Sequence, residues 1–378
     1  MAKLHYFNPE NDIALATGVR NFTPPKAAVA LRAAGAMLPM WYGEQGDSVI
    51  SHGVNAQWFH SVEEKFNTGI KPFDHSVTDE LRAAPWGWSL AVKDFYEREG
   101  FPPDRLPSDR SIEEWRLLSH RRMASSLREA IVQELDFEIA PAAVEIRTTN
   151  DLERLLTEQP ESMIKSPWSS SGRGLIDTRQ LSALEVLRRS EGIIRKQGSV
   201  MVERYYNRTV DFALLFECEN GNCSFTGYSL FKTDQTGSYS GNVLAPDTKL
   251  IEMIGQYYSK DRILAVAEAL RKAVERLIAP YYSGPLGVDM LVAQLEDGSE
   301  LLDATVELNL RMTMGFVAHS LSLNYLAEGS EGTYSAVPAN KIPVIDDMIV
   351  DNRKMINGRI NLTPPGGLFR FLAEVKSL

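Results

Sequence analysis

Apolar and polar positions alternate most clearly between residues 284 and 315, where the pattern predicts two β-strands and a turn. Residues 288–295 are mostly apolar, residues 296–299 (Glu-Asp-Gly-Ser) have the composition of a turn, and residues 301–310 are again apolar until polar residues interrupt them. This segment is therefore expected to form a β-hairpin.

Three polar side chains stand at alternate positions at the end of the second strand. Glu307, Asn309 and Arg311 fall on one face of that strand, because successive side chains point to opposite faces. Burying a carboxylate, an amide and a guanidinium without partners is costly. The pattern has two interpretations, an edge strand with its polar face in water or a binding site.

Asp289 on the first strand favours the second interpretation. In a simple hairpin it falls opposite Val306 or Glu307, depending on the length of the turn. Opposite Glu307, it would place two carboxylates side by side, which is unfavourable unless a cation joins them. Oxygen atoms of Asp289, Glu307 and Asn309 would suit Mg²⁺ carrying nucleotide phosphates, and Arg311 is then placed to hold a phosphate oxygen.

The first residues of the chain predict a parallel α/β layer. Residues 4–7 have a strand pattern, residues 26–36 form an alanine-rich helix, and residues 36–42 read as the next strand. The segment contains no G-x-G-x-x-G fingerprint. Asn8, Asn11 and Asp12 follow the first strand and are candidate ligand contacts, although capping a helix or closing a turn is the more common role of such residues.

Residues 111–135 predict one long helix with Ser111 as its cap and Glu114 three residues later. This helix contains the basic pair Arg121 and Arg122. The pattern alone favours a solvated helix face for this pair.

A lysine at the end of the strand 162–164 begins a segment of small residues that runs from Lys165 to Gly174. Backbone N–H groups of such a segment can cover a polyphosphate. The lysine comes first, so this is not a Walker A loop. Loops rich in serine and glycine are also common as plain surface connections.

The second half of the chain changes character. Antiparallel strands with turns between them replace the α/β pattern, and a polar loop, two helices, a mixed tail and a last short helix follow. The expected strands cover residues 199–204, 209–217 and 224–232, the loop covers 233–242, and the helices cover 259–277 and 316–326. With a proline-rich boundary at 101–110, three domains are predicted, over residues 1–110, 111–202 and 203–378.

Composition narrows the class of protein. The 378 residues are 44% hydrophobic and 24% charged, as in an ordinary globular protein, and the net charge of −10 argues against a nucleic-acid partner. Cys218 and Cys223 make neither a disulfide framework nor a zinc site. No apolar run reaches the ~18 residues of a membrane helix, so no membrane partner and a cytoplasmic location are expected. The aromatic stretch 86–95 could serve a homodimer as well as a core.

The order of four motifs resembles that of the ATP-grasp superfamily. These are the lysine with its Ser/Gly loop, the V-x-V-E segment ending at Glu203, the G-V-D segment ending at Asp289, and the E-x-N-x-R segment 307–311. The similarity covers residues 111–326 and implies a multidomain α/β and α+β protein, with an N-terminal α/β domain preceding the ATP-grasp fold. The first hundred residues match no ligase subfamily of this superfamily.

The resemblance implies a role for each motif residue. Asp289, Glu307 and Asn309 would carry Mg²⁺, and Arg311 would steady the transferred phosphoryl group. The remaining positions would contact ATP: Lys165 under the phosphates, the loop of Ser169, Ser170, Ser171, Gly172, Arg173 and Gly174 over them, Glu203 with the backbone of Arg204 to Tyr206 at adenine, Asp211 at ribose, Lys232 at a further phosphate, and Arg121 (or Arg122) where relatives carry a lysine.

The activity that the resemblance implies is ligation of a carboxylate to an amine. ATP would phosphorylate the carboxylate, and an amine would displace phosphate from the acyl phosphate. Amino acids or small peptides are the substrates that the superfamily suggests. Two alternatives are a kinase on the same scaffold and a non-catalytic nucleotide-binding protein.

Overall fold

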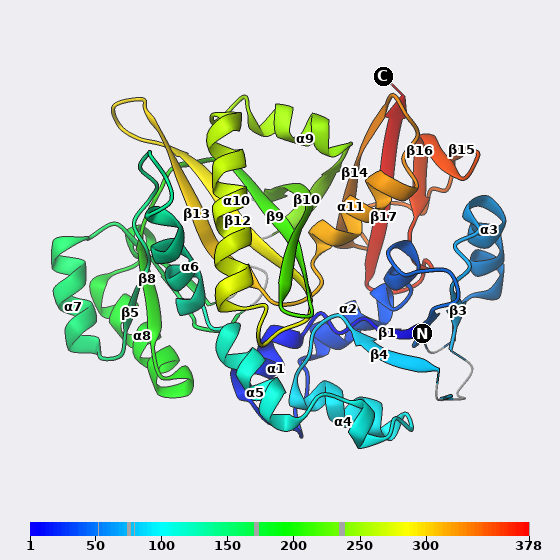
Figure 1. The fold of residues 1–378 in the computed structure, drawn as a ribbon, viewed down its shortest axis with the longest axis horizontal. Helices are drawn as coiled ribbons and strands as arrows, with labels where there is room; N and C mark the ends of the chain where they lie inside the picture. Colours follow the sequence, from blue (N-terminus) through cyan, green and yellow to red (C-terminus); the bar gives the residue numbers. More distant parts are fainter. Residues whose placement is uncertain (52, 74–76, 79, 170–173, 234–238, 378) are drawn as a thin grey trace.

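A computed structural model describes residues 1–51, 53–73, 77–78, 80–169, 174–233 and 239–377. The strands in these ranges form three sheets (Figure 1). Two sheets of four strands and one of nine strands follow one another along the chain.

The first sheet is parallel and has the order β3-β2-β1-β4. Its strands are β1 (Ala2–Tyr6), β2 (Ser48–Val49), β3 (Lys71–Pro72) and β4 (Leu81–Pro85). The helices of this part are α1 (Asn11–Thr17), α2 (Lys26–Gly35), α3 (Ala56–Phe66) and α4 (Leu90–Arg98), with short 3₁₀ helices η1 (Leu38–Trp41) and η2 (Pro103–Arg105).

The expected strand over residues 36–42 is wrong, because η1 occupies its centre. Leu38, Met40 and Trp41 are all fully buried, so the segment shows no alternation that would separate a strand from a buried helix. Pro39 stands in the first turn of η1, where its missing N–H costs nothing. The strand that follows β1 in the sheet is β2.

The predicted helix over residues 111–135 is two helices, α5 (Asp109–Leu118) and α6 (Arg122–Val132). The cap of α5 is Ser108 rather than Ser111, and its hydroxyl accepts the Ser111 N–H at 3.0 Å. Residues 119–121 leave the helix and turn the chain toward the second sheet.

The second sheet is antiparallel with the order β5-β8-β6-β7. Helices α7 and α8 pack beside it in Figure 1. Its elements are β5 (Val144–Ile146), α7 (Thr149–Glu158), β6 (Ser162–Lys165), β7 (Leu175–Asp177), η3 (Thr178–Gln180), α8 (Ala183–Gln197) and β8 (Val200–Arg204).

The third sheet has the order β13-β12-β9-β10-β11-β14-β17-β16-β15. The strands are β9 (Arg208–Glu219), β10 (Asn222–Thr233), β11 (Tyr239–Leu244), β12 (Gly284–Gln294), β13 (Glu300–Asn309), β14 (Ser330–Pro338), β15 (Ile349–Asp351), β16 (Lys354–Asn361) and β17 (Phe369–Ser377). The helices are α9 (Asp247–Ile254), α10 (Lys260–Leu277) and α11 (Met314–Asn324). The predicted hairpin is confirmed as β12 and β13.

Two sequence predictions fail in this sheet. Residues 239–242 of the expected loop 233–242 belong to β11, while residues 234–238 lie outside the described ranges. The expected C-terminal helix is the strand β17, in which Phe371, Ala373 and Val375 are buried at alternate positions. Leu372 between them is buried as well, and β17 pairs with β14 on one side and β16 on the other, which makes this segment a strand.

The N-terminal layer packs against the last strands of the chain. The Phe7 and Phe371 rings meet edge to face at 5.9 Å, and the Trp41 indole N–H donates to the Leu362 carbonyl at 2.6 Å. The two ends of the sequence therefore share one hydrophobic core, which fixes the N-terminal sheet beside the nine-stranded sheet. The domain limits given above stay a prediction.

Substitution of Gly35 tests this packing. A Cβ atom there would lie 2.2 Å from the Phe7 ring, so Gly35→Ala is expected to lower the free energy of unfolding by about 1–3 kcal/mol. Gly192→Ala in α8 is the control, because its Cβ would meet nothing and it should raise stability by about 0.5–1 kcal/mol. Urea unfolding measures both, and equal effects would contradict the packing at Gly35.

Candidate functional site

The hairpin β12–β13 has the register that places its two carboxylates side by side. Asp289 is paired with Glu307, and Gly287 with Asn309. The Asn309 Nδ2 donates to Asp289 Oδ2 at 3.2 Å. Burial, and after it the negative charge of Glu307, raise the pKa of Asp289 to about 7. Val288 and Leu308 point to the opposite face and are buried in the core against α10.

The break between α5 and α6 brings Arg121 into the site. The His120 Nδ1 accepts the Arg122 N–H at 3.0 Å, and the Arg121 N–H donates to the Pro167 carbonyl at 3.1 Å. The Arg121 guanidinium then donates to the Ser166 carbonyl at 3.1 Å and to Glu307 Oε1 at 2.7 Å. Arg121 is buried, so the solvated helix face favoured by its pattern is wrong for this residue.

Lys165 and Glu203 form an ion pair on neighbouring strands of the second sheet. Lys165 ends β6 beside Met201 of β8, and Glu203 is two residues further along β8. Both side chains are largely buried. Burial raises the pKa of Glu203, and the ammonium of Lys165 acts against that rise.

The Ser/Gly segment after Lys165 is fixed at both of its described ends. The Ser166 N–H donates to the Gly174 carbonyl at 3.1 Å, and Gly174 has a φ of +71°, which a glycine adopts without strain. The Trp168 indole donates to the Arg116 carbonyl at 3.0 Å, and the Arg116 guanidinium lies 4.3 Å from its ring centre. Ser169 is half-buried, while Ser170, Ser171, Gly172 and Arg173 lie outside the described residues.

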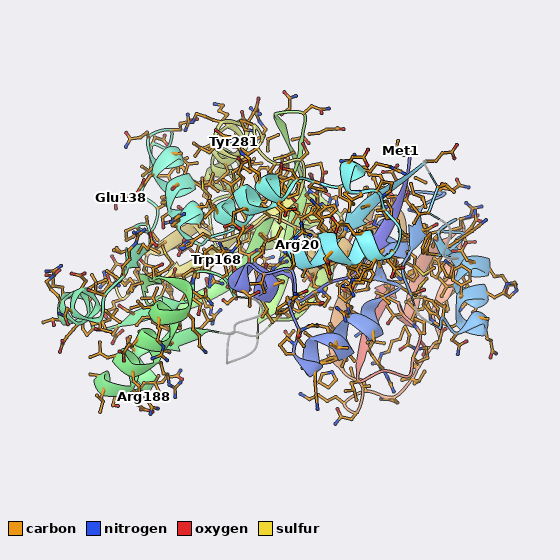
Figure 2. All side chains as sticks on the ribbon, turned by 90° about the horizontal axis from the view of Figure 1, so that it is seen from below. Met1, Arg20, Glu138, Trp168, Arg188 and Tyr281 are labelled. Atoms are coloured by element: carbon orange, nitrogen blue, oxygen red, sulfur yellow. The ribbon has the colours of Figure 1, made fainter. Side chains whose placement is uncertain are left out.

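Trp168 therefore ties the segment to α5 at the junction between the second sheet and the helices (Figure 2). The backbone N–H of Trp168 also donates to the Gln197 side-chain oxygen at 3.0 Å. The His120 ring packs edge-on against the Trp168 ring, with 4.6 Å between the ring centres. Sequence reasoning treated this tryptophan only as part of the loop.

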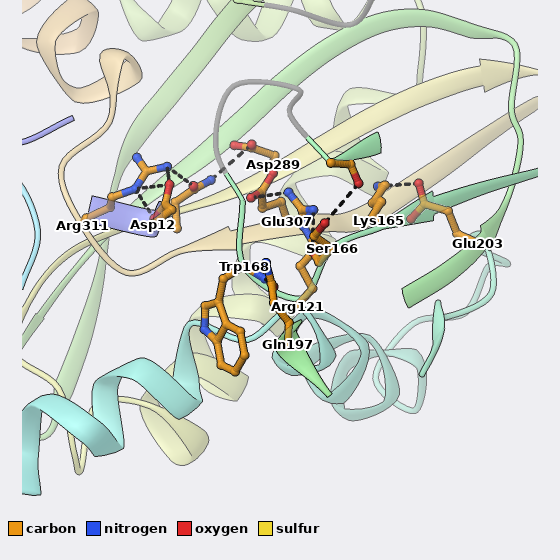
Figure 3. Close-up of polar contacts among 12 residues, drawn as sticks. Asp12, Arg121, Lys165, Ser166, Trp168, Gln197, Glu203, Asp289, Glu307 and Arg311 are labelled. Carbon is orange, nitrogen blue, oxygen red and sulfur yellow. Dashed lines mark hydrogen bonds and ion pairs between the residues drawn. The ribbon is translucent and has the colours of Figure 1, made fainter. Parts of the chain in front are cut away.

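Arg311 is held by a residue from the other end of the chain. Its Nη2 donates to Asp12 Oδ2 at 2.7 Å and to Asn309 Oδ1 at 2.7 Å, and its Nε donates to Asp12 Oδ1 at 3.0 Å (Figure 3). Asp12 lies in the first turn of α1, directly after β1. The N-terminal layer thus supplies a side chain to the polar cluster around the hairpin.

Asp211 lies on the same face of the third sheet as Asp289. It is paired with Leu291 on β12 and Phe231 on β10, and its carboxylate lies 3.6 Å from the Arg208 guanidinium. Lys232 is the next residue after Phe231, so strand alternation turns it to the other face, where it is exposed. The geometry does not bring Lys232 to the carboxylates.

Arg204 and Tyr206 stand where β8 ends and the chain crosses to β9. Arg204 is exposed and Tyr206 is half-buried in the connection. Burial raises the pKa of the Tyr206 hydroxyl, with Asp303 acting in the same direction. The nucleotide contacts expected of these residues stay predictions.

The sequence analysis missed a buried ion pair beneath the site. Arg128 on α6 pairs with Asp303 on β13, and its Nε donates to the Thr305 hydroxyl at 2.9 Å. The sequence contained a sign of this pair, because Asp303 and Thr305 are polar residues at alternate positions on the same strand as Glu307 and Asn309, nearer the turn. The pair joins α6, and so the helix break, to the strand that carries Glu307.

No known family model matches the chain, and no curated protein matches it in sequence. Solved structures do resemble it. A biotin carboxylase–β,γ-ATP complex from Campylobacter jejuni matches 98% of this chain and 87% of its own, with 12% identity and a TM-score of 0.54. Phosphoribosylamine–glycine ligase from Thermotoga maritima matches 100% and 93%, with 12% identity and a TM-score of 0.50.

A third similar structure is the biotin carboxylase domain dimer of the Hydrogenobacter thermophilus 2-oxoglutarate carboxylase, with MgADP, ADP and bicarbonate. It matches 99% of this chain and 85% of its own, with 11% identity and a TM-score of 0.50. The chain is a multidomain α/β protein with the ATP-grasp fold, as the sequence motifs predicted. Within the described ranges, no helix combines the length and apolar character needed to cross a bilayer.

Removing Arg128 tests the buried pair. Arg128→Leu leaves the Asp303 carboxylate buried without its partner, so the free energy of unfolding is expected to fall by about 3–5 kcal/mol. Arg128→Leu combined with Asp303→Leu should recover most of that loss. Arg110→Leu, which breaks an exposed pair with Glu114, is the control and should cost less than about 1 kcal/mol. Denaturant unfolding that ranks the two single variants equally would contradict this role.

Proposed function

We propose that this protein is an ATP-dependent ligase that joins a carboxylate to an amine and releases ADP and phosphate. The observation that carries the proposal is the pairing of Asp289 with Glu307, with Asn309 beside them, in a cluster that also holds Arg121 and Arg311. These groups come from different parts of the chain. An arrangement of acids and cations of this kind suits a metal-bound polyphosphate.

The residues of the hairpin fit Mg²⁺. Asp289, Glu307 and Asn309 offer carboxylate and amide oxygens, which are the ligands that this ion prefers. Burial first, and then the neighbouring charge of Glu307, raise the pKa of Asp289, and a divalent cation would offset the cost of both. Among the described residues, no three His, Cys, Asp or Glu side chains are placed to hold a metal ion together, so phosphate and water oxygens would complete the coordination. Bound Mg²⁺ would neutralise charge on the phosphate oxygens.

The second sheet would hold the nucleotide. Lys165 is a buried cation that can bind phosphate oxygens when ATP competes with Glu203 for it. Glu203 and the backbone of Arg204 to Tyr206 would contact adenine, and Asp211 the ribose. The segment from Ser169 to Gly174 would cover the phosphates, with its ends fixed through Ser166 and Trp168. Lys232 is the least supported of these assignments, because it lies on the other face of the sheet.

The reaction needs positioning and charge neutralisation more than a side-chain nucleophile. A carboxylate oxygen of the substrate attacks the γ-phosphorus of ATP, the bond to the bridging oxygen breaks, and ADP leaves. The amine nitrogen then attacks the acyl carbon, phosphate leaves, and the nitrogen loses a proton. Arg311 would steady the transferred phosphoryl group, and Asp12 would hold its guanidinium in place.

The substrates would be small molecules of the amino-acid or small-peptide class. A cytoplasmic location and a homodimer stay predictions for this chain, and the dimer named above is a property of the 2-oxoglutarate carboxylase domain.

Glu307→Gln is expected to abolish Mg²⁺-dependent ADP release, with a loss of at least about 100-fold, because it removes one of the two carboxylate charges that would hold Mg²⁺ and leaves Arg121 without its charged partner. Glu300→Gln at the exposed start of the same strand is the matched control and should keep wild-type activity. ADP release is measured by a coupled assay, and the fold by circular dichroism. Wild-type ADP release from the folded Glu307 variant would rule out the metal site.

ADP release is expected to require both a carboxylate and an amine. A pooled panel of amino acids and small carboxylates, with and without amine acceptors, measures this requirement in the presence of Mg²⁺ and ATP. ADP formation with a single substrate would contradict the ligase function and support a kinase. No ADP formation together with no effect of Mg·ATP on the melting temperature would contradict nucleotide binding itself.

A further inference from the structure

A cavity of about 470 Å³ lies at the carboxyl ends of the parallel strands in the N-terminal sheet. The segments that follow three strands line it: Asn8 and Asn11 after β1, Ser51 after β2 and Ser89 after β4. In the sheet, β1 lies between β2 and β4, so the chain leaves β1 toward one side and later returns on the other. Open parallel sheets bind ligands at such a crevice.

One carboxylate in this cavity has an oxygen atom to which no described residue donates a hydrogen bond. The Glu10 side chain is 6% exposed, and its Oε1 pairs with the Arg32 guanidinium. Within the described ranges, Glu10 Oε2 and the Ser51 hydroxyl have no hydrogen-bond partner. Burial raises the pKa of Glu10, against the effect of Arg32. A buried carboxylate oxygen without a donor is costly, so a ligand that supplies an N–H would be held strongly.

The other residues of the cavity indicate which kind of ligand would supply this N–H donor. Phe22, Pro24, Val29 and Phe95 give it apolar walls. Its two arginines already have acidic partners, since Arg32 pairs with Glu10 and Arg98 pairs with Asp94 at 3.1 Å. Of the unsatisfied groups, the Glu10 carboxylate oxygen can only accept and the Ser51 hydroxyl can accept or donate, which favours a cation with a short apolar body over an anion.

The cavity is next to the residues that hold Arg311. Asn11 lines the cavity, and the following residue, Asp12, pairs with Arg311. Gly87 marks how close the two are, because a Cβ there would lie 2.5 Å from the Asn11 amide nitrogen and 3.1 Å from Arg311 Cβ. A molecule in the cavity is thus separated from the polar cluster only by the turn at the start of α1.

We propose that this cavity binds the amine substrate, a primary amine with a short apolar body whose ammonium group contacts Glu10 and Ser51. The statement that this amine is a substrate rests on the ligase function proposed above. The binding of an amine to the cavity is independent of that function, and the two are tested separately.

The probe for binding is n-butylamine, compared with n-butanol and butyrate, measured by saturation-transfer NMR on the full-length protein without nucleotide. Butylamine, protonated at neutral pH, is expected to bind more tightly than either analogue. Glu10→Gln should weaken its binding about tenfold or more, the loss expected for a hydrogen bond to a buried charge. Glu374→Gln, which removes a carboxylate 3.0 Å from Arg359 elsewhere, is the matched control and should not change it.

A second variant leaves Glu10 in place. Ala33→Leu adds volume at an exposed helix position that lines the cavity, and it should also weaken butylamine binding. In the ligase assay, Glu10→Gln should raise the KM for the amine and leave the KM for ATP unchanged.

Butyrate binding as tightly as butylamine would overturn the proposal, as would wild-type affinity in both cavity variants or no transfer to butylamine at all. If butylamine binds but ADP release does not require an amine, the ligase function is contradicted and only the amine-binding site stands. Loss of ADP release in Glu307→Gln with unchanged butylamine binding would support both.

Discussion

The repulsion between two neighbouring carboxylates is the constraint on which the site depends. Asp289 and Glu307 are partners across β12 and β13, and burial makes each charge more costly for the other. Positive charge must offset that cost. Arg121 and Arg311 supply it here, one from the break between two helices and one from the end of β13, and each is held by groups far away in the sequence. The Mg²⁺ proposed above would act on the same charges.

This constraint joins the three sheets. Arg121 contacts Glu307 on the nine-stranded sheet and the Ser166 carbonyl beside the second sheet, so it lies at their junction. Asp12 brings the N-terminal layer to Arg311, and the contact between Phe7 and Phe371 fixes that layer in place. A change in the relative position of the sheets would therefore change the charge balance at the carboxylates. In the proposed ligase, this would be a physical route for coupling nucleotide binding to substrate binding.

The hairpin and the order of the motifs could be predicted because they depend on local alternation and spacing. Lys165, Asp289 and Glu307 became candidate site residues in this way, and the resemblance of the motif order to the ATP-grasp superfamily predicted the fold. Local patterns could not reveal contacts set by tertiary structure. The buried run at η1 has no period, the break at Arg121 depends on a hydrogen bond to Pro167, and the partner of Arg311 is 299 residues away. The alternate positions of Asp303 and Thr305 were visible but were not used.

The most direct test of the account is a crystal structure with a non-hydrolysable ATP analogue and Mn²⁺ in place of Mg²⁺. The account predicts an anomalous peak between Asp289 and Glu307, phosphates that lie between this peak and Lys165, and adenine near Glu203 and Tyr206. A nucleotide bound elsewhere, or a metal without contact to either carboxylate, would contradict it.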